Sequence, residues 1–491
     1  MDFLNERELS RLRGFFLAGP KRGLNWPLIL LLAGVALFAG AALAYLTPVG
    51  GLAVLIAGAG ALLMLRDLRW ALLALLGIIC LLPFASLPFK IGFTPTFLDL
   101  VFAALYAVWA VRLVTRRQED LILTPAGWPV LAFMAIAVFA FVLGLSHSRP
   151  TSNDLRVFAE ILMGIGMFFL IVNNVRDEGW LRFLTGALIL GGAGQGAIGI
   201  LLYVIPKTWA AALLNPLARL SYPAGLGALR YINDDPSRPM RAIGTSVDPN
   251  ILGALLVIVL AVAGVQLVAK RPVLRRGWLV VCVALMGVCL FLTYSRSSMV
   301  GAVAALGLVA LLRYRRLLVV LLIAGLLLLL LPQTQAYLSH FVEGIRIQDR
   351  ATLMRIGEYR DTIKLIQRYP WLGVGFVGAP DIDLYLAVAM IYLTILGQMG
   401  IIGLIVFLVA MTVFLLYVYR AWRGLPRGAS LEPYLLGYGA AIFGSLSAGF
   451  FDHTLLTYPH AVALLWFTLG MGAAAARLAL HVQQRTQQQP D

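Results

Sequence analysis

Charged side chains are scarce in this chain of 491 residues. Asp, Glu, Lys and Arg make up 13% of the sequence, whereas a soluble domain carries about 25%. Hydrophobic residues make up 61%, and the mean hydropathy is +0.89. These values exclude a soluble globular protein. Uncharged apolar runs such as 317–331 and 401–419 are long enough, or nearly so with their flanks, to cross a bilayer.

Cysteine is also rare. Cys80, Cys282 and Cys289 all fall within apolar runs, so they provide neither a disulfide framework nor the spacing of a metal site. Acidic residues number 23 against 39 Lys and Arg, a formal net charge of +16. Such an excess can indicate nucleic-acid binding, but most of it lies beside the expected membrane spans, where anionic lipid attracts it. We therefore expect membrane lipids, and no nucleic acid, as partners.

The apolar segments predict an all-α fold, that of a polytopic helical membrane protein with about 14 transmembrane helices (12–14). The number depends on residues 383–420, which we interpret as an outer amphipathic segment leading into one long span, because two spans would put three inner arginines outside. The expected spans are 26–46, 49–65, 70–84, 96–113, 126–145, 156–173, 181–204, 248–269, 277–294, 298–313, 317–332, 393–419, 431–450 and 460–478.

The distribution of Lys and Arg predicts the orientation of these spans. With a cytoplasmic N-terminus, inner segments hold 24 of the 39 basic residues, short outer loops hold four, and two long outer loops hold the other eleven. Short loops determine orientation, and they keep their positive charge on the cytoplasmic side. Both termini are therefore expected in the cytoplasm, with two long extracytoplasmic loops.

The expected organisation has seven parts. They are a cytoplasmic amphipathic N-terminus at 1–24, N-terminal transmembrane helices at 25–205, a first long outer loop at 206–247, central transmembrane helices with a Ser-Arg motif at 248–332, a second long outer loop at 333–392, C-terminal transmembrane helices at 393–478, and a glutamine-rich, disordered tail at 479–491.

The second long outer loop carries a regular series of basic residues. Positions three or four apart share one face of a helix, so the spacing predicts a basic amphipathic helix at about 349–368. One interpretation is a helix lying on anionic headgroups. The other is a ligand-binding element. The residues are Arg346, Arg350, Arg355, Arg360, Lys364 and Arg368.

Three arginines fall at the expected outer membrane edge. Arg241 precedes one span, Arg296 lies in a very short connection between two spans, and Arg355 lies in the predicted outer helix. Arginine at a membrane edge is costly and usually functional. A purely structural interpretation of Arg296 is that its side chain reaches the lipid headgroups. Asp248, which begins the span after Arg241, is expected to be an ordinary helix N-cap.

Motifs around these arginines resemble those of the O-antigen ligase and polysaccharide polymerase superfamily over about residues 240–410. The resemblance is carried by Arg241 with Gly-Thr-Ser-Val-Asp-Pro-Asn at 244–250, by Ser295-Arg296, by Arg355 with Pro-Trp-Leu-Gly-Val-Gly at 370–375, and by Tyr392-Leu393 with Gly-Ile-Ile-Gly-Leu at 400–404.

The resemblance implies a metal-independent glycosyltransferase, without cofactor, in the bacterial inner (plasma) membrane. Such enzymes take a glycan from an undecaprenyl-diphosphate carrier at the extracytoplasmic face and join it to a polysaccharide or lipid acceptor. Arg241, Arg296 and Arg355 would then bind the lipid diphosphate, because the planar guanidinium binds phosphate oxygens bidentately and stays charged.

One position departs from the ligase pattern. Ligases have a His-Asn pair eleven residues before the first glycine of the Gly-x-x-Gly-Leu motif, and here that position is Ala389. Another group must then activate the acceptor, if a base is used. His453 is the first candidate because an ordinary histidine titrates near neutral pH, and Asp383 is the second. Asp381 and Glu358 are further candidates.

Other functions remain open from the sequence. The main alternative is a transporter or flippase for a lipid-linked or anionic substrate, although no matched repeat halves are evident. A peptidoglycan polymerase of the shape-and-division type would use the same carrier lipid. A scaffold-like member without activity is a further alternative because of Ala389.

Overall fold

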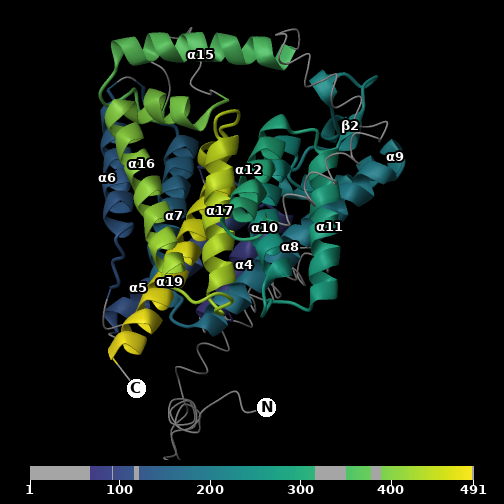
Figure 1. Ribbon diagram of the computed structural model, residues 1–491. Helices are drawn as coiled ribbons and strands as arrows, with labels where there is room; N and C mark the ends of the chain where they lie inside the picture. The colour runs from purple at the N-terminus through teal and green to yellow at the C-terminus, as the bar shows by residue number, and fades with distance from the viewer. Residues whose placement is uncertain are drawn as a thin grey trace, which may run out of the picture. The chain divides into compact units, whose positions relative to one another are not determined.

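The structure is a computed structural model that describes residues 63, 67–90, 92–115, 121–146, 148–315, 350–377 and 389–488 (Figure 1). The chain divides into two compact units, Met1–Trp70 and Ala71–Asp491. The first unit is described only at Leu63 and at 67–70, where helix α4 begins. Everything that follows concerns the second unit.

The described chain is almost entirely helical, and most of its helices are apolar. The α-helices are α4 (Leu68–Leu81), α5 (Phe97–Val114), α6 (Gly127–Gly144), α7 (Ser152–Asn174), α8 (Glu178–Val204), α9 (Lys207–Leu214), α10 (Pro249–Val268), α11 (Arg276–Leu292), α12 (Arg296–Leu312), α15 (Arg350–Arg368), α16 (Ile391–Arg423), α17 (Glu432–Ala448), α18 (Thr454–Thr457) and α19 (Pro459–Gln488). Two short strands, β1 (Arg230–Tyr231) and β2 (Met240–Arg241), pair antiparallel.

The predicted spans agree with these helices wherever the chain is described. Seven described helices, α5, α6, α7, α8, α10, α16 and α19, are long and apolar enough to cross a membrane, and α4, α11 and α12 are shorter apolar helices. The chain is thus an all-α, multi-pass membrane protein. Apart from Leu63, the predicted spans at 26–46, 49–65 and 317–332 and the amphipathic segment at 1–24 lie outside the described residues. The number of spans and their orientation therefore stay predictions.

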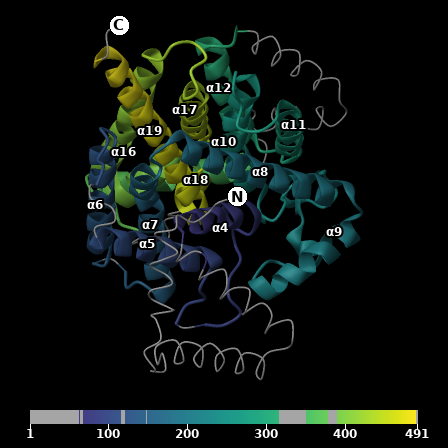
Figure 2. The ribbon, with the colours of Figure 1, turned by 90° about the horizontal axis from the view of Figure 1, so that it is seen from below.

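Helices α10 and α19 form the interior of the bundle, where the most hydrophobic windows of α10 and α19 are 78% and 94% buried. Seen along the bundle, α10 lies near the centre, while α6 and α11 lie on opposite sides (Figure 2). α12 crosses α17 at a pair of glycines, where a Cβ on Gly301 would meet the Gly444 carbonyl oxygen at 2.8 Å. Small residues allow helices in a membrane to approach this closely, and the contact fixes the position of α12.

α16 is broken at Gly400, whose φ of 66° and ψ of −169° lie in a region that only glycine readily adopts. An unbroken helix would join the N–H groups of Ile401 and Ile402 to the carbonyls of Gly397 and Gln398. The break therefore leaves four polar backbone groups without helical partners, in a setting where unsatisfied backbone is costly.

The segment Pro370–Gly375 supplies all four missing partners. The carbonyls of Pro370 and Trp371 accept from Ile401 and Ile402 (2.8 and 3.3 Å), and the N–H groups of Val374 and Gly375 donate to Gly397 and Gln398 (2.9 and 3.0 Å). Gly373 and Gly375 have positive φ and contact backbone directly. The glycines of this motif thus allow contact with α16 and α6, and the segment holds the C-terminal end of α15 on the bundle.

The predicted amphipathic helix at 349–368 is confirmed as α15, which lies across one end of the bundle, above α16 in the view of Figure 1. The β1–β2 pair lies at the same end of the bundle. The tail differs from the prediction, because α19 continues to Gln488 rather than becoming disordered at 479. Gln483 donates to the Ala421 carbonyl at 2.9 Å, and Ala, Leu, Gln and Arg in this segment favour helix.

Candidate functional site

A polar pocket of about 120 Å³ at this end of the bundle brings together the three arginines that the sequence singled out. They come from three separate segments: β2, the start of α12, and α15. The lining residues are Tyr231, Asn233, Asp234, Arg241, Asn250, Tyr294, Arg296, Ser297 and Arg355.

Arg241 is held in place by the elements around the pocket. Its backbone pairs with Arg230 in the β1–β2 ladder, its Nε donates to the Thr293 carbonyl at 2.8 Å, and its Nη2 donates to Asn250 Oδ1 at 2.9 Å. Arg241 therefore joins the α11–α12 connection to the first turn of α10. The sequence did not predict these contacts of Arg241, because no nearby residue indicated a partner for its side chain.

The loop after Arg241 enters the bundle and is clamped by Gln195 of α8. Gln195 donates to Ser246 Oγ at 2.8 Å and accepts from Thr245 Oγ1 at 3.0 Å. Gly244 has a φ of 53°, and a Cβ there would meet the Gln195 amide. Gln195, Thr245 and Ser246 are buried. Sequence reasoning missed Gln195, whose one signal is a polar amide in an otherwise apolar span.

Two helices begin at the pocket. Asp248 caps α10, accepting from the Asn250 and Ile251 N–H groups at 2.7 and 3.3 Å, as the sequence predicted. Arg296 is the first residue of α12, whose N-cap residue Ser295 makes no side-chain capping bond. The N-terminus of a helix carries partial positive charge and free N–H groups, which favour bound anions.

Arg355 is a half-buried residue of α15 and lines the pocket. Within the described residues its guanidinium makes no hydrogen bond or ion pair. One turn further on, burial raises the pKa of Tyr359, and the nearby Arg355 opposes that rise while Glu358 and Asp452 add to it. Arg355, Glu358 and Asp452 therefore each lie close enough to Tyr359 for their charges to affect its pKa.

The backbone around the pocket is strained. Five non-glycine residues of the described chain have positive φ, and three of them, Asn233 (56°), Asp234 (57°) and Tyr294 (52°), line this pocket. Such residues are uncommon, and strain of this kind collects where function requires a fixed geometry. Val247, beside the α10 cap, has a φ of 62°, which is a severe outlier for a β-branched side chain.

The charges of the pocket suit an anion. Three arginines face one aspartate, Asp234, which gives a formal net charge of +2 before the two helix N-termini are considered. The described residues contain no group of three or more His, Cys, Asp or Glu side chains placed to hold a metal ion.

The predicted base His453 does not line this pocket, but its neighbour Asp452 contacts the lining. Ser297 Oγ donates to Asp452 Oδ2 at 3.5 Å, and His453 Nδ1 lies 3.8 Å from Asp452 Oδ1, which is too far for a hydrogen bond. Burial raises the pKa of Asp452, but the proximity of His453 and the hydrogen bonds from Thr454 together outweigh burial, so that the pKa is lowered from its ordinary value. Asp452 was not predicted from the sequence.

Of the other predicted bases, Asp383 and Asp381 lie outside the described residues. Glu358 lies on α15, and its Oε2 accepts the N–H of Ala389 at 3.1 Å. The carboxylate thus contacts the position at which the sequence departs from the ligase pattern.

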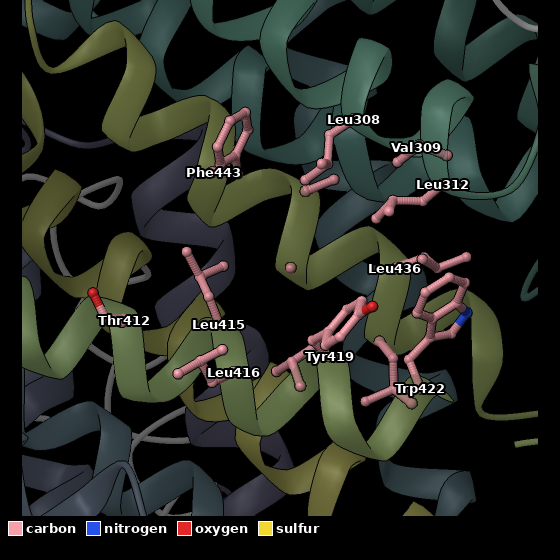
Figure 3. Close-up of a pocket in the computed structure, with 14 residues that line it drawn as sticks. Leu308, Val309, Leu312, Thr412, Leu415, Leu416, Tyr419, Trp422, Leu436 and Phe443 are labelled. Atoms are coloured by element: carbon pink, nitrogen blue, oxygen red, sulfur yellow. The ribbon is translucent and has the colours of Figure 1, made fainter. Parts of the chain in front are cut away.

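A second, larger cavity of about 400 Å³ lies between α12, α16 and α17 (Figure 3). Its lining is apolar except for a few groups such as Thr412, Tyr419 and the Trp422 indole. It includes the C-terminal part of α12, whereas the arginine pocket lies at the N-terminal end of that helix. Because no charged side chain lines this cavity, it is suited to bind a hydrocarbon chain and not to catalyse group transfer.

Comparison with known families finds a match that includes part of the arginine pocket but begins after Arg241 and Asn250. Residues 281–408 match the Wzy_C family, described as O-antigen ligase. The matched residues include Arg296 and Arg355. No curated protein matches the chain. The match confirms the resemblance to the O-antigen ligase and polysaccharide polymerase superfamily, and it supports a membrane glycan ligase or polymerase, a glycosyltransferase-like enzyme.

Proposed function

We propose that this chain transfers or polymerises a glycan taken from an undecaprenyl-diphosphate donor at the extracytoplasmic face of the bacterial inner membrane. The observation that carries the proposal is the pocket in which Arg241, Arg296 and Arg355 meet. Three cations and the N-terminus of α12, which has no side-chain cap, are suited to a diphosphate, which carries two negative charges as a diester. The volume of about 120 Å³ suits a compact anionic group rather than a sugar chain.

The arginines would act on the leaving group. When the acceptor oxygen bonds to the anomeric carbon, the bond from that carbon to the phosphate oxygen breaks and its electron pair stays on the diphosphate. Charge develops on that oxygen in the transition state, and preorganised donors stabilise it there. The guanidinium groups would supply this stabilisation by themselves, so the proposed transfer is metal-independent and needs no cofactor.

The acceptor's proton requires a separate group. His453 and Asp383 remain the candidates proposed from the sequence, and Asp452 connects His453 to the pocket through Ser297. An acceptor sugar gives a polysaccharide polymerase, and a lipid acceptor gives an O-antigen ligase. A transporter or flippase would also bind the lipid diphosphate, but it would leave the glycosidic bond to the carrier intact.

Binding of undecaprenyl diphosphate to the full chain in nanodiscs tests the proposal. The wild type should bind undecaprenyl diphosphate more tightly than undecaprenol, and Arg296→Ala should weaken the diphosphate binding by about 10- to 100-fold, the value of a charge-assisted hydrogen bond. Arg219→Ala, at an exposed position of the first outer loop outside the pocket, is the matched control. Equal binding of both lipids would refute the site.

Turnover distinguishes the enzyme from a transporter. Lipid-linked glycan extracted from the native host should be consumed by wild-type protein, with release of undecaprenyl diphosphate. Arg296→Ala should lose this release, and Arg219→Ala should keep it. Movement of intact donor across a vesicle membrane without release would favour the flippase instead.

A further inference from the structure

The carboxylates near the pocket differ in their capacity to accept a proton. Asp452 receives hydrogen bonds from the Thr454 N–H, the Thr454 hydroxyl and the Ser297 hydroxyl. Most of its acceptor capacity is thus occupied, and its lowered pKa makes it a weak base. Asp234 lines the arginine pocket, where a bound diphosphate would take the space next to it. Neither arrangement leaves a carboxylate open to an acceptor hydroxyl.

Glu358 is placed differently. It lies three residues after Arg355 on α15, so the two side chains share one helix face with Cβ atoms about 5–6 Å apart. Its Oε2 accepts the Ala389 N–H at 3.1 Å, and the described residues provide no hydrogen bond to its Oε1. The hydroxyl of Thr362 donates to the Glu358 carbonyl at 2.8 Å. The carboxylate is therefore oriented through Oε2, and among the described residues no donor is bound to Oε1.

The position of Ala389 adds to this arrangement. Its N–H fixes the carboxylate, and it stands where the ligases have a histidine. α15 itself is held by the docking of Pro370–Gly375 into the α16 break. Arg355 and Glu358 belong to the same helix, α15, so the distance between them is determined by helix geometry and not by a loop.

We propose that Glu358 is the general base of the transfer reaction, accepting the acceptor's proton next to the diphosphate that Arg355 binds. This inference rests on the proposed function. Oε1 takes the hydroxyl proton while the acceptor oxygen bonds to the anomeric carbon. The carbon–oxygen bond to the diphosphate breaks, the diphosphate leaves with the electron pair, and the proton passes from Glu358 to water after the product departs.

Glu358→Gln tests the proposal, because glutamine keeps the carbonyl that accepts the Ala389 N–H but cannot take a proton. General-base catalysis contributes about 10²- to 10⁴-fold, so kcat should fall at least about 100-fold. Binding of undecaprenyl diphosphate should stay as in the wild type, because the arginines are intact. Asp361→Asn is the matched control, since it removes a carboxylate of α15 that pairs with Lys364, and it should keep wild-type kcat.

A second variant tests whether a different proton acceptor at this place restores activity. Glu358→Gln combined with Ala389→His places an imidazole on the residue whose N–H holds the carboxylate, and it should recover at least about tenfold of the lost kcat. The recovered rate should fall as the pH drops through about 6.5, the ordinary pKa of histidine. A residue with a purely structural role would give neither the rescue nor the new pH dependence.

The outcomes separate this proposal from the proposed function. Wild-type kcat in Glu358→Gln, or a 100-fold loss in His453→Ala with none in Glu358→Gln, overturns Glu358 as the base but leaves the enzyme assignment intact. Loss of undecaprenyl diphosphate binding in Glu358→Gln shows a binding role and also overturns the proposal. Absence of donor consumption by the wild type overturns the proposed function itself.

Discussion

The carbonyl of Trp371 occupies the place that a side chain on Gly400 would need. A Cβ on Gly400 would lie 2.2 Å from the Trp371 carbonyl carbon and 2.3 Å from its oxygen. Two motifs that are some 30 residues apart in the sequence thus meet backbone to backbone, and the break in α16 and the end of α15 form one structure. Because α15 carries Arg355, this contact determines where the third arginine lies.

Gly400→Ala should therefore destabilise the protein and remove activity together. Backbone strain at such a conformation costs roughly 1–3 kcal/mol, and an added methyl in a filled space typically costs about 1–3 kcal/mol more. Thermal unfolding in detergent measures the loss. Gly357→Ala is the control, because a Cβ there meets nothing within 4 Å. Equal melting temperatures for wild type and Gly400→Ala would show that the docking does not stabilise the fold.

Arg355 and Arg241 should respond differently to removal. Arg355→Ala should weaken binding of the lipid diphosphate by about 10- to 100-fold at unchanged melting temperature, because no described residue depends on its hydrogen bonds. Arg355→Lys should restore only part of the binding, since lysine lacks the bidentate fork. Lipid-binding titrations and melting curves on the same preparations measure both effects.

Arg241→Ala should lose stability as well as binding. It leaves the carbonyl of buried Thr293 without the Arg241 donor, which costs about 1–3 kcal/mol. If Arg241→Ala melts like the wild type, its contacts with Thr293 and Asn250 do not contribute to the fold.

Asp452→Asn should destabilise the protein at neutral pH by about 1 kcal/mol, because a carboxylate accepts the Thr454 hydrogen bonds more strongly than an amide does. The folded pKa of Asp452 is lower than its ordinary value of 3.8. The contribution of the Asp452 carboxylate to stability is thus fully present above the pKa that Asp452 has in the unfolded chain. It is lost as the pH falls through the lower pKa that Asp452 has in the folded protein. The difference in melting temperature between variant and wild type should stay constant from pH 8 to about pH 5 and shrink only below about pH 4. A difference that disappears between pH 7 and pH 5 would contradict the lowered pKa.

Cysteine labelling tests the orientation predicted from the Lys and Arg distribution. The three native cysteines are buried, so a single introduced cysteine gives a clear signal. An impermeant maleimide added outside should modify Ser237→Cys in the first long loop and should not modify Ser430→Cys in the connection between α16 and α17. The reverse result would place the arginine pocket at the cytoplasmic face and remove a lipid-linked donor outside the membrane as its substrate.

Local sequence patterns predicted most of the helices. Apolar runs such as 249–268 are sufficient to specify a membrane helix. The backbone N–H and carbonyl groups of a segment inside the bilayer must bond to one another, and a helix achieves this without any tertiary contact. The spacing of basic residues predicted α15. The apolar runs placed Arg296 in a very short connection between two spans, and in the structure it is the first residue of α12. The gathering of three arginines at one end of the bundle followed from the expected orientation of the spans.

The relationships that build the site were decided by tertiary structure. The docking of Pro370–Gly375 on α16, the clamp of Gln195 on residues 245 and 246, and the contact of Glu358 with Ala389 each join segments that are far apart in the sequence. No local periodicity encodes such pairs. A sequence pattern specifies which face of an element is apolar, whereas the partner of a particular carbonyl, amide or carboxylate depends on which other backbone the folded bundle brings within about 3 Å.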